Sequence, residues 1–370
     1  MAAAALALTA TTALAAKPKS ELLYVGTQAT GAEQGLYGAR LDPATGKLTA
    51  LGRVADLAAP FWIASQPRTR VLFAGNAGPV GKPAQMTALT FDPDTGKLQT
   101  LGQVEVPAAP ISHLAYDARS RTLFVANFGA GAVSVLPVAA DGRLSPPATV
   151  AQDRGSGPTP RQAGPHPHEV VLDPTGRYLV VPDFGADRLF VYRFDPARRS
   201  LSPTTPEPVA LPPGSGPRRV VFLPGGRFVL QLSELSADLR LYRWDARAGT
   251  LSEVERRPLD PPDFKGTRSG AEMLLSPDGR HVYVSNRGDN TLIVYAIDGA
   301  AGSFREEQRL ASPGKTPWTF AFDRSGRWMV VANQGSDQLS VLKVDRKTGA
   351  LMATGESLSV PKPVALSFPD

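Results

Sequence analysis

The chain contains no cysteine, which excludes disulfide bonds, thiolate metal sites and thiol catalysis. Beyond the N-terminal segment, no run reaches the roughly 18 apolar residues of a membrane-spanning helix, so no membrane insertion is expected. Charged residues make up only 20% of the chain, and the net charge of +6 comes from single Lys and Arg residues at turns. A nucleic-acid-binding surface needs a clustered basic patch, so no nucleic-acid partner is expected. The motifs H-E-x-x-H, G-x-S-x-G and G-x-x-x-x-G-K-[ST] are also missing, which argues against zinc peptidase, common serine hydrolase and P-loop chemistry.

The first sixteen residues, MAAAALALTATTALAA, are small and apolar. Ala13-Leu14-Ala15 fits an A-x-A cleavage site, and the polar sequence KPKSE follows it. Residues 1–16 are therefore predicted to be the remainder of a secretory signal peptide, and the protein to be periplasmic or secreted. If this leader is not a signal, the protein is expected in the cytoplasm. Residues 17–370 are predicted to form a single domain.

A unit of about fifty residues repeats along the chain. Each copy has an apolar strand, a D-P-x-G-like turn, a second strand, a polar turn and a third strand that ends near an aspartate. The clearest copies span residues 168–195, 219–245, 272–298 and 318–345. The 35 glycines and 35 prolines are scattered between these strands, which is typical of many short strands joined by turns.

The second strand of every copy ends on a polar residue. These residues are Thr27, Asn76, Asn127, Asp183, Ser233, Asn286 and Asn333, with gaps of 47 to 56 residues. Such spacing, with about four strands per copy, is typical of a propeller rather than a solenoid. The predicted fold is therefore an all-β, seven-bladed β-propeller with four antiparallel strands per blade.

The two ends of the domain are each incomplete as a repeat. The N-terminal LLYVGT is a second strand with no first strand before it, and the C-terminal VALSF, residues 364–368, is a first strand with nothing after it. We expect the C-terminal strand to complete the N-terminal blade, because this closes the ring and removes free sheet edges.

Strand direction predicts which face carries a site. The start of each first strand and the end of each second strand lie on one face, and the D-P-x-G turns lie on the other. Three of the four histidines, His113, His166 and His168, fall at first-strand starts. Residues that differ from copy to copy are thus concentrated on one face, near the central axis.

Segments on this face resemble the lactonase-type seven-bladed propellers, which include bacterial propeller 6-phosphogluconolactonases and a fungal carboxy-muconate lactonizing enzyme. The more specific matches are Gly164-Pro-His-Pro-His168 and Gly214-Ser-Gly-Pro-Arg218. Further matches are Tyr24-Val-Gly-Thr27, Ala126-Asn-Phe-Gly129, Ala271-Glu272, Ser285-Asn-Arg-Gly288 and Ala332-Asn-Gln334. The resemblance covers essentially the whole chain after the leader.

The resemblance implies that His168, Glu234, Arg218 and Arg287 are the catalytic residues around the channel. The chain departs from the family pattern at Arg219, where a histidine is usual, and at Ser233, where an asparagine is usual. An acidic residue common after the second strand of blade 2 is replaced by Asn76-Ala77-Gly78. These changes leave the four residues intact and leave the identity of the substrate open.

Lactone hydrolysis needs an activated water and stabilisation of an oxyanion, which assigns roles to these side chains. His168 is the candidate base, because the ordinary pKa of histidine is near neutrality. Glu234 would orient His168, act as the base, or protonate the leaving alkoxide. Arg218 and Arg287 would hold an anionic substrate group or the oxyanion. The alternative for all four is a structural network of ion pairs and hydrogen bonds between blades.

Six further residues on the same face are candidates for substrate binding. They are Glu272, His113, His166, Asn127, Asp183 and Gln334. Because His and Arg are as frequent there as carboxylates, an anion suits this face better than a hard cation such as Ca²⁺. No metal or cofactor is therefore expected.

The favoured function is hydrolysis of a sugar or small anionic lactone by a monomer without a cofactor. Two alternatives stay open: a non-enzymatic exported propeller that binds a protein or polysaccharide, and a lactonizing cycloisomerase of the muconate type. Fold alone does not decide among them. A scaffold has no need of unique His, Glu and Arg side chains converging on one face, whereas both enzymes would use the two arginines.

Overall fold

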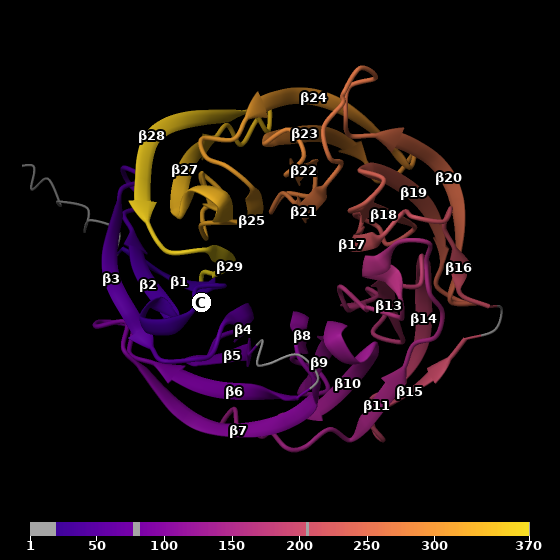
Figure 1. Ribbon diagram of the computed structural model, residues 1–370, viewed down its shortest axis with the longest axis horizontal. Coiled ribbons are helices and arrows are strands. Elements are labelled where there is room, and N and C mark those ends of the chain that lie inside the picture. The colour runs from indigo at the N-terminus through magenta and orange to yellow at the C-terminus, as the bar shows by residue number, and fades with distance from the viewer. Residues whose placement is uncertain (1–19, 77–81, 205–206, 370) are drawn as a thin grey trace, which may run out of the picture.

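The computed structural model describes residues 20–76, 82–204 and 207–369. The predicted leader, residues 1–16, lies outside this part of the chain. The described residues form seven sheets arranged in a ring (Figure 1), with four short 3₁₀ turns and no α-helix among them. No helix in these ranges is long and apolar enough to cross a membrane.

The blades are numbered here in chain order, and each is given from its innermost to its outermost strand. Blade 1 is β29 (Pro363–Ser367), β1 (Glu21–Thr27), β2 (Leu36–Leu41) and β3 (Leu48–Ala55). Blade 2 is β4 (Pro60–Gln66), β5 (Val71–Asn76), β6 (Pro83–Phe91) and β7 (Leu98–Ala108). Blade 3 is β8 (Ile111–Asp117), β9 (Thr122–Asn127), β10 (Ala132–Pro137) and β11 (Thr149–Gln152). Blade 4 is β12 (Val171–Leu172), β13 (Tyr178–Asp183), β14 (Arg188–Asp195) and β15 (Ser200–Pro203), with β16 (Val209–Ala210) also paired to β14. Blade 5 is β17 (Pro217–Phe222), β18 (Phe228–Ser233), β19 (Asp238–Asp245) and β20 (Thr250–Pro258). Blade 6 is β21 (Gly270–Leu275), β22 (His281–Asn286), β23 (Thr291–Asp298) and β24 (Ser303–Ala311). Blade 7 is β25 (Pro317–Phe322), β26 (Trp328–Asn333), β27 (Gln338–Val344) and β28 (Leu351–Ser359).

The ring closes as the sequence predicts. The C-terminal strand β29 pairs antiparallel with β1, and its register runs from Tyr24 opposite Ser367 to Thr27 opposite Pro363. Figure 1 shows β29 beside β1 near the centre of the ring. The seven predicted strand ends are also confirmed, because β1, β5, β9, β13, β18, β22 and β26 end at the seven polar residues.

The core lies between the blades. Seven buried apolar clusters fill the seven interfaces between neighbouring sheets of the described chain. Strand alternation places one face of each sheet against each neighbouring blade, so nearly every side chain of the second strands is buried. This packing fixes the inner strands around the axis and so fixes the positions of side chains that reach the channel.

A bulge near the start of the inner strand recurs around the ring. The register shifts between Pro60 and Trp62, Ile111 and His113, Pro217 and Arg219, Gly270 and Met273, and Pro317 and Thr319. A bulge sets two residues opposite one on the partner strand and re-aims a side chain. Two consecutive residues, such as Arg218 and Arg219, can therefore both reach the channel, which a regular strand would not allow.

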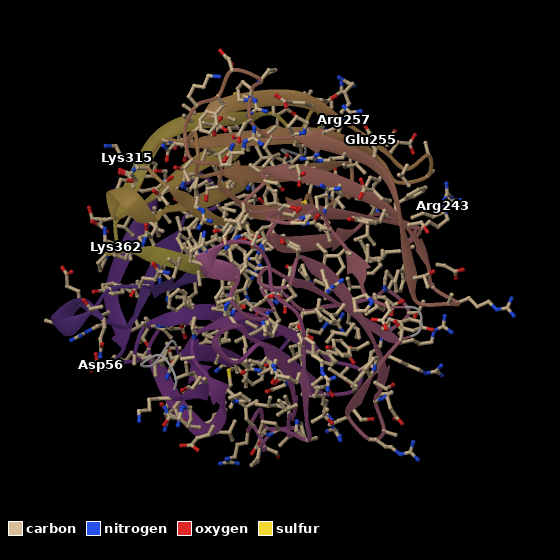
Figure 2. The ribbon with its side chains drawn as sticks, turned by 45° about the vertical axis from the view of Figure 1, so that its right-hand side comes forward. Asp56, Arg243, Glu255, Arg257, Lys315 and Lys362 are labelled. Carbon is tan, nitrogen blue, oxygen red and sulfur yellow. The ribbon has the colours of Figure 1, made fainter. Side chains whose placement is uncertain are left out.

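The outer surface carries charges of both signs. Figure 2 shows this for Asp56, Arg243, Glu255, Arg257, Lys315 and Lys362, which come from several blades and project from the ring. Glu255 pairs with Arg257 on β20, at 2.5 Å, and both are partly exposed. The labelled charges are therefore those of an ordinary solvated surface.

Candidate active site

A cavity of about 160 Å³ lies among the starts of the inner strands. It is lined by Gln28, Phe61, Trp62, Pro110, Ile111, Ser112, Phe128, Arg161, His168, Arg218, Arg219, Glu234, Arg287 and Trp318. The lining thus includes four aromatic rings and five charged side chains. Most of its wall is apolar, and a few polar groups converge on it, as is usual for small-molecule sites.

His168 reaches this cavity because the preceding loop is fastened to blade 3. The Ser112 hydroxyl donates a hydrogen bond to the Pro167 carbonyl at 2.9 Å. The ring of His166 stacks on Phe128, with centroids 4.5 Å apart, and its Nδ1 lies 2.8 Å from the Phe128 carbonyl oxygen. The two prolines of Gly164-Pro-His-Pro-His168 further restrict the loop backbone. His166 therefore positions the loop, whereas His168 lines the cavity.

Glu234 binds three guanidiniums that come from different parts of the ring. Its Oε2 accepts a hydrogen bond from Arg218 Nη1 at 2.7 Å and lies 3.0 Å from Arg287 Nη2. Its Oε1 accepts from Arg161 Nη2 at 2.8 Å. Arg218 also donates from Nη1 to His168 Nε2, at 2.5 Å, and from Nε to a backbone carbonyl of blade 6. Arg161, His168, Arg218, Glu234 and Arg287 are called the Glu234 cluster below.

The charges in this cluster fix the protonation state of Glu234. Burial alone would raise the pKa of the Glu234 carboxyl, but the charges of Arg287, Arg218 and Arg161 outweigh it and lower that pKa to about 2. Burial and the charge of Arg287 lower the pKa of Arg218 to about 9. Both groups are charged at neutral pH. Three guanidiniums and one carboxylate leave the cluster with a net charge of +2.

His168 is neutral in this setting. Burial, followed by the charges of Arg218, Arg219 and Arg287, holds its pKa well below the ordinary value of 6.5. Because Arg218 donates to Nε2, the ring proton belongs on Nδ1, which is buried with no hydrogen-bond partner among the described residues. The imidazole thus presents an unprotonated nitrogen to the guanidinium at neutral pH.

A second charged group surrounds Arg219, which is 1% exposed. Arg219 Nη2 donates to Glu272 Oε2 at 2.7 Å, Nη1 donates to Glu169 Oε1 at 3.3 Å, and the guanidinium lies over the Trp62 ring at 4.3 Å. His113 Nε2 is 3.6 Å from Glu169 Oε1. Burial raises the pKa of Glu169 to about 7, and burial with the Arg219 charge lowers the pKa of His113 well below 6.5.

These contacts place two predicted substrate-binding residues behind the cavity wall. His113, Glu169, Arg219 and Glu272 are called the Arg219 cluster, and of its members only Arg219 lines the cavity. Glu272 also accepts from the Thr319 hydroxyl at 2.8 Å and is 1% exposed. The cluster therefore supports the cavity from behind through buried polar side chains that contact one another.

The other predicted substrate-binding residues hold the scaffold. Asn127 is fully buried and donates to the Ser134 hydroxyl at 2.9 Å, inside blade 3. Asp183 is fully buried, and its Oδ1 accepts from the backbone N–H groups of His166 and Ala186, both at 2.8 Å. Neither reaches the cavity wall. Gln334 donates to Gln28 Oε1 at 3.0 Å and so contacts a lining residue.

Asp183 forms a buried carboxyl pair with Asp153, which is 1% exposed. Burial and the charge of Asp183 raise the pKa of Asp153 well above its ordinary value of 3.8, and Tyr192 donates its hydroxyl proton to Asp153 Oδ1. Of the two carboxyls, Asp153 is therefore the one that keeps its proton more readily. The pair links the end of blade 3 to the loop that carries His166 and His168.

Replacing Asp153 by asparagine should make the protein more stable than the wild type, by an amount that grows as pH rises. Folding raises the pKa of Asp153, so keeping it protonated costs more as pH climbs above 3.8, and the wild type loses stability. Asparagine mimics the protonated carboxyl and removes this cost. We expect thermal melts at pH 4 to 8 to give D153N a Tm advantage of roughly 2 °C, or about 1 kcal/mol, near neutrality. A variant less stable than the wild type at every pH would contradict this assignment.

Several lining residues were not anticipated from the sequence, among them Gln28, Trp62 and Arg161. Glu169, behind the wall, was also missed. The described residues contain no group of three or more His, Asp or Glu side chains arranged to hold a metal ion. A larger hollow, of about 810 Å³, lies along the outer strands of blades 4 and 5 and shares no residue with the cavity.

Comparison with known proteins gives three kinds of match. The family described as "Lactonase, 7-bladed beta-propeller" matches residues 22–368. The chain is 29% identical to the 6-phosphogluconolactonase of Bacillus subtilis over 347 residues, which are 93% of this chain and 97% of that protein. The structure resembles the periplasmic gluconolactonase of Pseudomonas aeruginosa, with a TM-score of 0.89, 38% identity and coverage of 95% and 99%. It also resembles a putative 6-phosphogluconolactonase of Bacteroides fragilis, with a TM-score of 0.87, 27% identity and coverage of 96% and 99%.

Proposed function

We propose that this chain, which belongs to the lactonase family of seven-bladed β-propellers, hydrolyses a sugar or small anionic lactone in the 160 Å³ cavity. The observation that carries the proposal is the pair of buried guanidiniums, Arg218 and Arg287, that face this cavity beside a neutral imidazole. The Bacillus subtilis and Pseudomonas aeruginosa proteins that this chain resembles are both named for action on lactones. The cavity suits a small molecule, because its 160 Å³ is the volume that about five water molecules occupy in the liquid.

The two arginines suit the charge that develops during hydrolysis. When a water oxygen adds to the lactone carbonyl carbon, the carbonyl oxygen becomes an oxyanion. Donors fixed in advance around that oxygen lower the barrier because they need no rearrangement as charge appears. Arg218 and Arg287 are held in place by Glu234 and stacked against Trp318, at 5.6 and 4.4 Å from the ring centroid. We assign both guanidiniums to the carbonyl oxygen.

His168 is the proposed base. In the free protein its Nε2 accepts a hydrogen bond from Arg218. When substrate binds, before any charge develops, Arg218 turns from Nε2 to the substrate carbonyl. The Nε2 lone pair can then take a proton from the attacking water. The ring C–O bond then breaks, the leaving alkoxide takes that proton from His168, and the imidazole returns to its neutral form. Base and acid steps thus use one nitrogen, and the product is the open-chain hydroxy acid.

Glu234 is assigned a positioning role. A carboxyl whose pKa is about 2 is ionised at neutral pH, so it has no proton to give to a leaving alkoxide, and it is a weak base. Its three ion pairs instead keep mutually repelling guanidiniums close together. Of the roles considered for Glu234 on sequence grounds, orientation fits this geometry best, acting through the arginines.

Periplasmic or secreted location remains part of the proposal. It is supported by the small, apolar leader and by the likeness to a protein described as a periplasmic gluconolactonase. An exported enzyme would meet few phosphorylated sugars, so its substrate would then be an unphosphorylated lactone.

A pH-stat assay tests the function. Purified protein should hydrolyse glucono-δ-lactone or 6-phosphoglucono-δ-lactone faster than a buffer blank, with δ-valerolactone as an aliphatic comparison. We expect the same rate with and without EDTA, because the proposed steps use only side chains of the chain. If no lactone is hydrolysed above the blank, the proposed function is wrong, and a rate abolished by EDTA would contradict the metal-independent chemistry.

A further inference from the structure

Arg161 is the exposed member of the Glu234 cluster. Its side chain is 60% exposed, whereas those of Arg218 and Arg287 are 3% and 8% exposed. It comes from the 3₁₀ turn Pro160–Gln162, in the loop between blades 3 and 4. Arg161 is therefore the guanidinium that a solute meets as it enters the cavity.

The backbone under Arg161 is firmly held. The neighbouring Gln162 is fully buried, and its Nε2 donates to the Phe184 carbonyl at 2.9 Å and to Asp187 Oδ1 at 2.8 Å. The Arg161 guanidinium itself lies over the Phe184 ring, 4.7 Å from its centroid. The side chain is thus exposed at its tip but anchored at its base, which is the arrangement of a preorganised ligand-binding group.

Arg161 can bind a ligand without leaving Glu234 unpaired. Arg161 uses only Oε1 of Glu234, and Oε2 keeps both Arg218 and Arg287. If Arg161 turned toward an anion, Glu234 would still be paired. The cluster has a net charge of +2, so a bound anion would reduce its charge imbalance, and Arg287 Nε is a further buried donor with no partner among the described residues.

We propose that Arg161 determines substrate specificity by binding an anionic oxygen group on the lactone, at the end away from the reacting carbonyl. This inference rests on the proposed function and narrows its substrate class to lactones that carry an anionic group, which is a carboxylate if the protein is exported and a phosphate or a carboxylate if it is cytoplasmic. Guanidinium binds either group through two parallel hydrogen bonds. Arg218, Arg287 and His168 act at the carbonyl, and Arg161 holds the distal charge at the cavity mouth.

The test compares substrates that differ in one group. Wild-type protein and Arg161→Met are assayed with 6-phosphoglucono-δ-lactone, with D-glucaro-1,5-lactone for a carboxylate, and with uncharged glucono-δ-lactone. We expect Arg161→Met to raise KM for a charged substrate about 10- to 100-fold, with kcat changed less than threefold. The rise in KM for glucono-δ-lactone should be smaller by about fivefold or more, because this substrate has no charged group for Arg161 to bind. Arg161→Lys should recover part of the affinity because it keeps the charge.

Arg154→Met is the matched control, because Arg154 is exposed on the same loop but lines the separate 810 Å³ hollow. It should leave all three KM values unchanged. Equal losses of Arg161→Met on charged and uncharged lactones would show a structural clamp and overturn the proposal, as would no loss on either charged substrate. A wild type that hydrolyses none of the three lactones would instead refute the proposed function itself. Preference for one charged substrate identifies phosphate or carboxylate as the group bound.

Discussion

Replacing Arg218 by alanine should lower kcat/KM for lactone hydrolysis by about 100- to 1,000-fold, the usual cost of losing one oxyanion donor. The change also removes the hydrogen bond to His168 Nε2 and one of the two partners of Glu234 Oε2. Because the oxyanion exists only in the transition state, the loss should fall mainly on kcat rather than on KM. Steady-state kinetics on the best substrate of the lactone screen measures both.

Loss of folding could imitate this result, because a buried ion pair broken on one side typically costs 3–5 kcal/mol. Circular dichroism and a thermal melt of the variant are therefore needed alongside the kinetics. Arg218→Lys provides a second variant: it keeps the charge but cannot bind Ala271 O, His168 and Glu234 through one planar fork. It should remain at least tenfold slower than the wild type.

Arg243→Ala is the control on the same blade, because Arg243 is exposed on β19 and projects from the outer surface (Figure 2). Its kinetics should match those of the wild type. A folded Arg218→Ala protein whose kcat/KM lies within threefold of the wild type would remove Arg218 from the reaction.

The fold could be predicted from the sequence because the same strand pattern recurs along the chain, so that no single uncertain strand decides the prediction. One strand–turn–strand unit is a weak signal, but seven polar strand ends at 47 to 56 residue spacing leave few architectures. Each of those ends coincides with the end of an observed strand, from Thr27 to Asn333. The unmatched strands at the two termini also predicted ring closure, because an unpaired sheet edge would be costly.

The site could be predicted only where it follows the repeat or the family motifs. His168, Arg218, Glu234 and Arg287 were expected around the channel, and all four line one cavity. Arg161 was missed because it stands on a loop with no counterpart in other copies, and its partner Glu234 is 73 residues away in the chain. No periodicity connects two such positions.

Glu169 was missed for a different reason. In a regular strand the residue after a channel-facing one points to the opposite side, so Glu169 was not expected near the channel once His168 was placed there. The bulge removes this alternation at Arg219, and in blade 4 the register also changes by one residue, between Pro167 opposite Asp183 and Val171 opposite Val180. Glu169 and Arg219 each follow a residue that lines the cavity. Asn127 and Asp183 show the opposite case: strand ends share a face with the channel, but these two side chains bind their own blade and loop.

Replacing Glu234 by glutamine should affect activity and stability together. The three guanidiniums would lose their shared carboxylate, and their mutual repulsion would move Arg218 and Arg287 from the carbonyl oxygen. We expect kcat/KM to fall tenfold or more, because the displaced arginines contact the substrate. Removing a charge at the edge of the cavity should reduce kcat/KM less than this. Glutamine has nearly the shape of glutamate, so this change isolates the charge.

The stability difference between wild type and E234Q should depend on pH in a defined direction. Folding lowers the pKa of Glu234 from 4.5 to about 2, so its ionised form stabilises the fold above pH 4.5 and loses that effect as pH falls toward 2. The shift corresponds to about 3 kcal/mol at neutral pH. Urea unfolding at pH 7, 5, 4 and 3 should show the wild type more stable by about this amount at pH 7, with the gap less than half as large at pH 3.

Glu255→Gln is the control for this pH dependence, because Glu255 forms a partly exposed pair with Arg257 on β20 (Figure 2). Exposed pairs contribute about 0–1 kcal/mol, so its unfolding free energy should stay within that range of the wild type. A gap for E234Q that stays constant from pH 7 to 3 would mean that the carboxylate charge does not hold the arginines. Since the proposed chemistry requires two like charges side by side at one oxygen, E234Q should lose activity together with the pH-dependent stabilisation that the Glu234 carboxylate gives to the wild type.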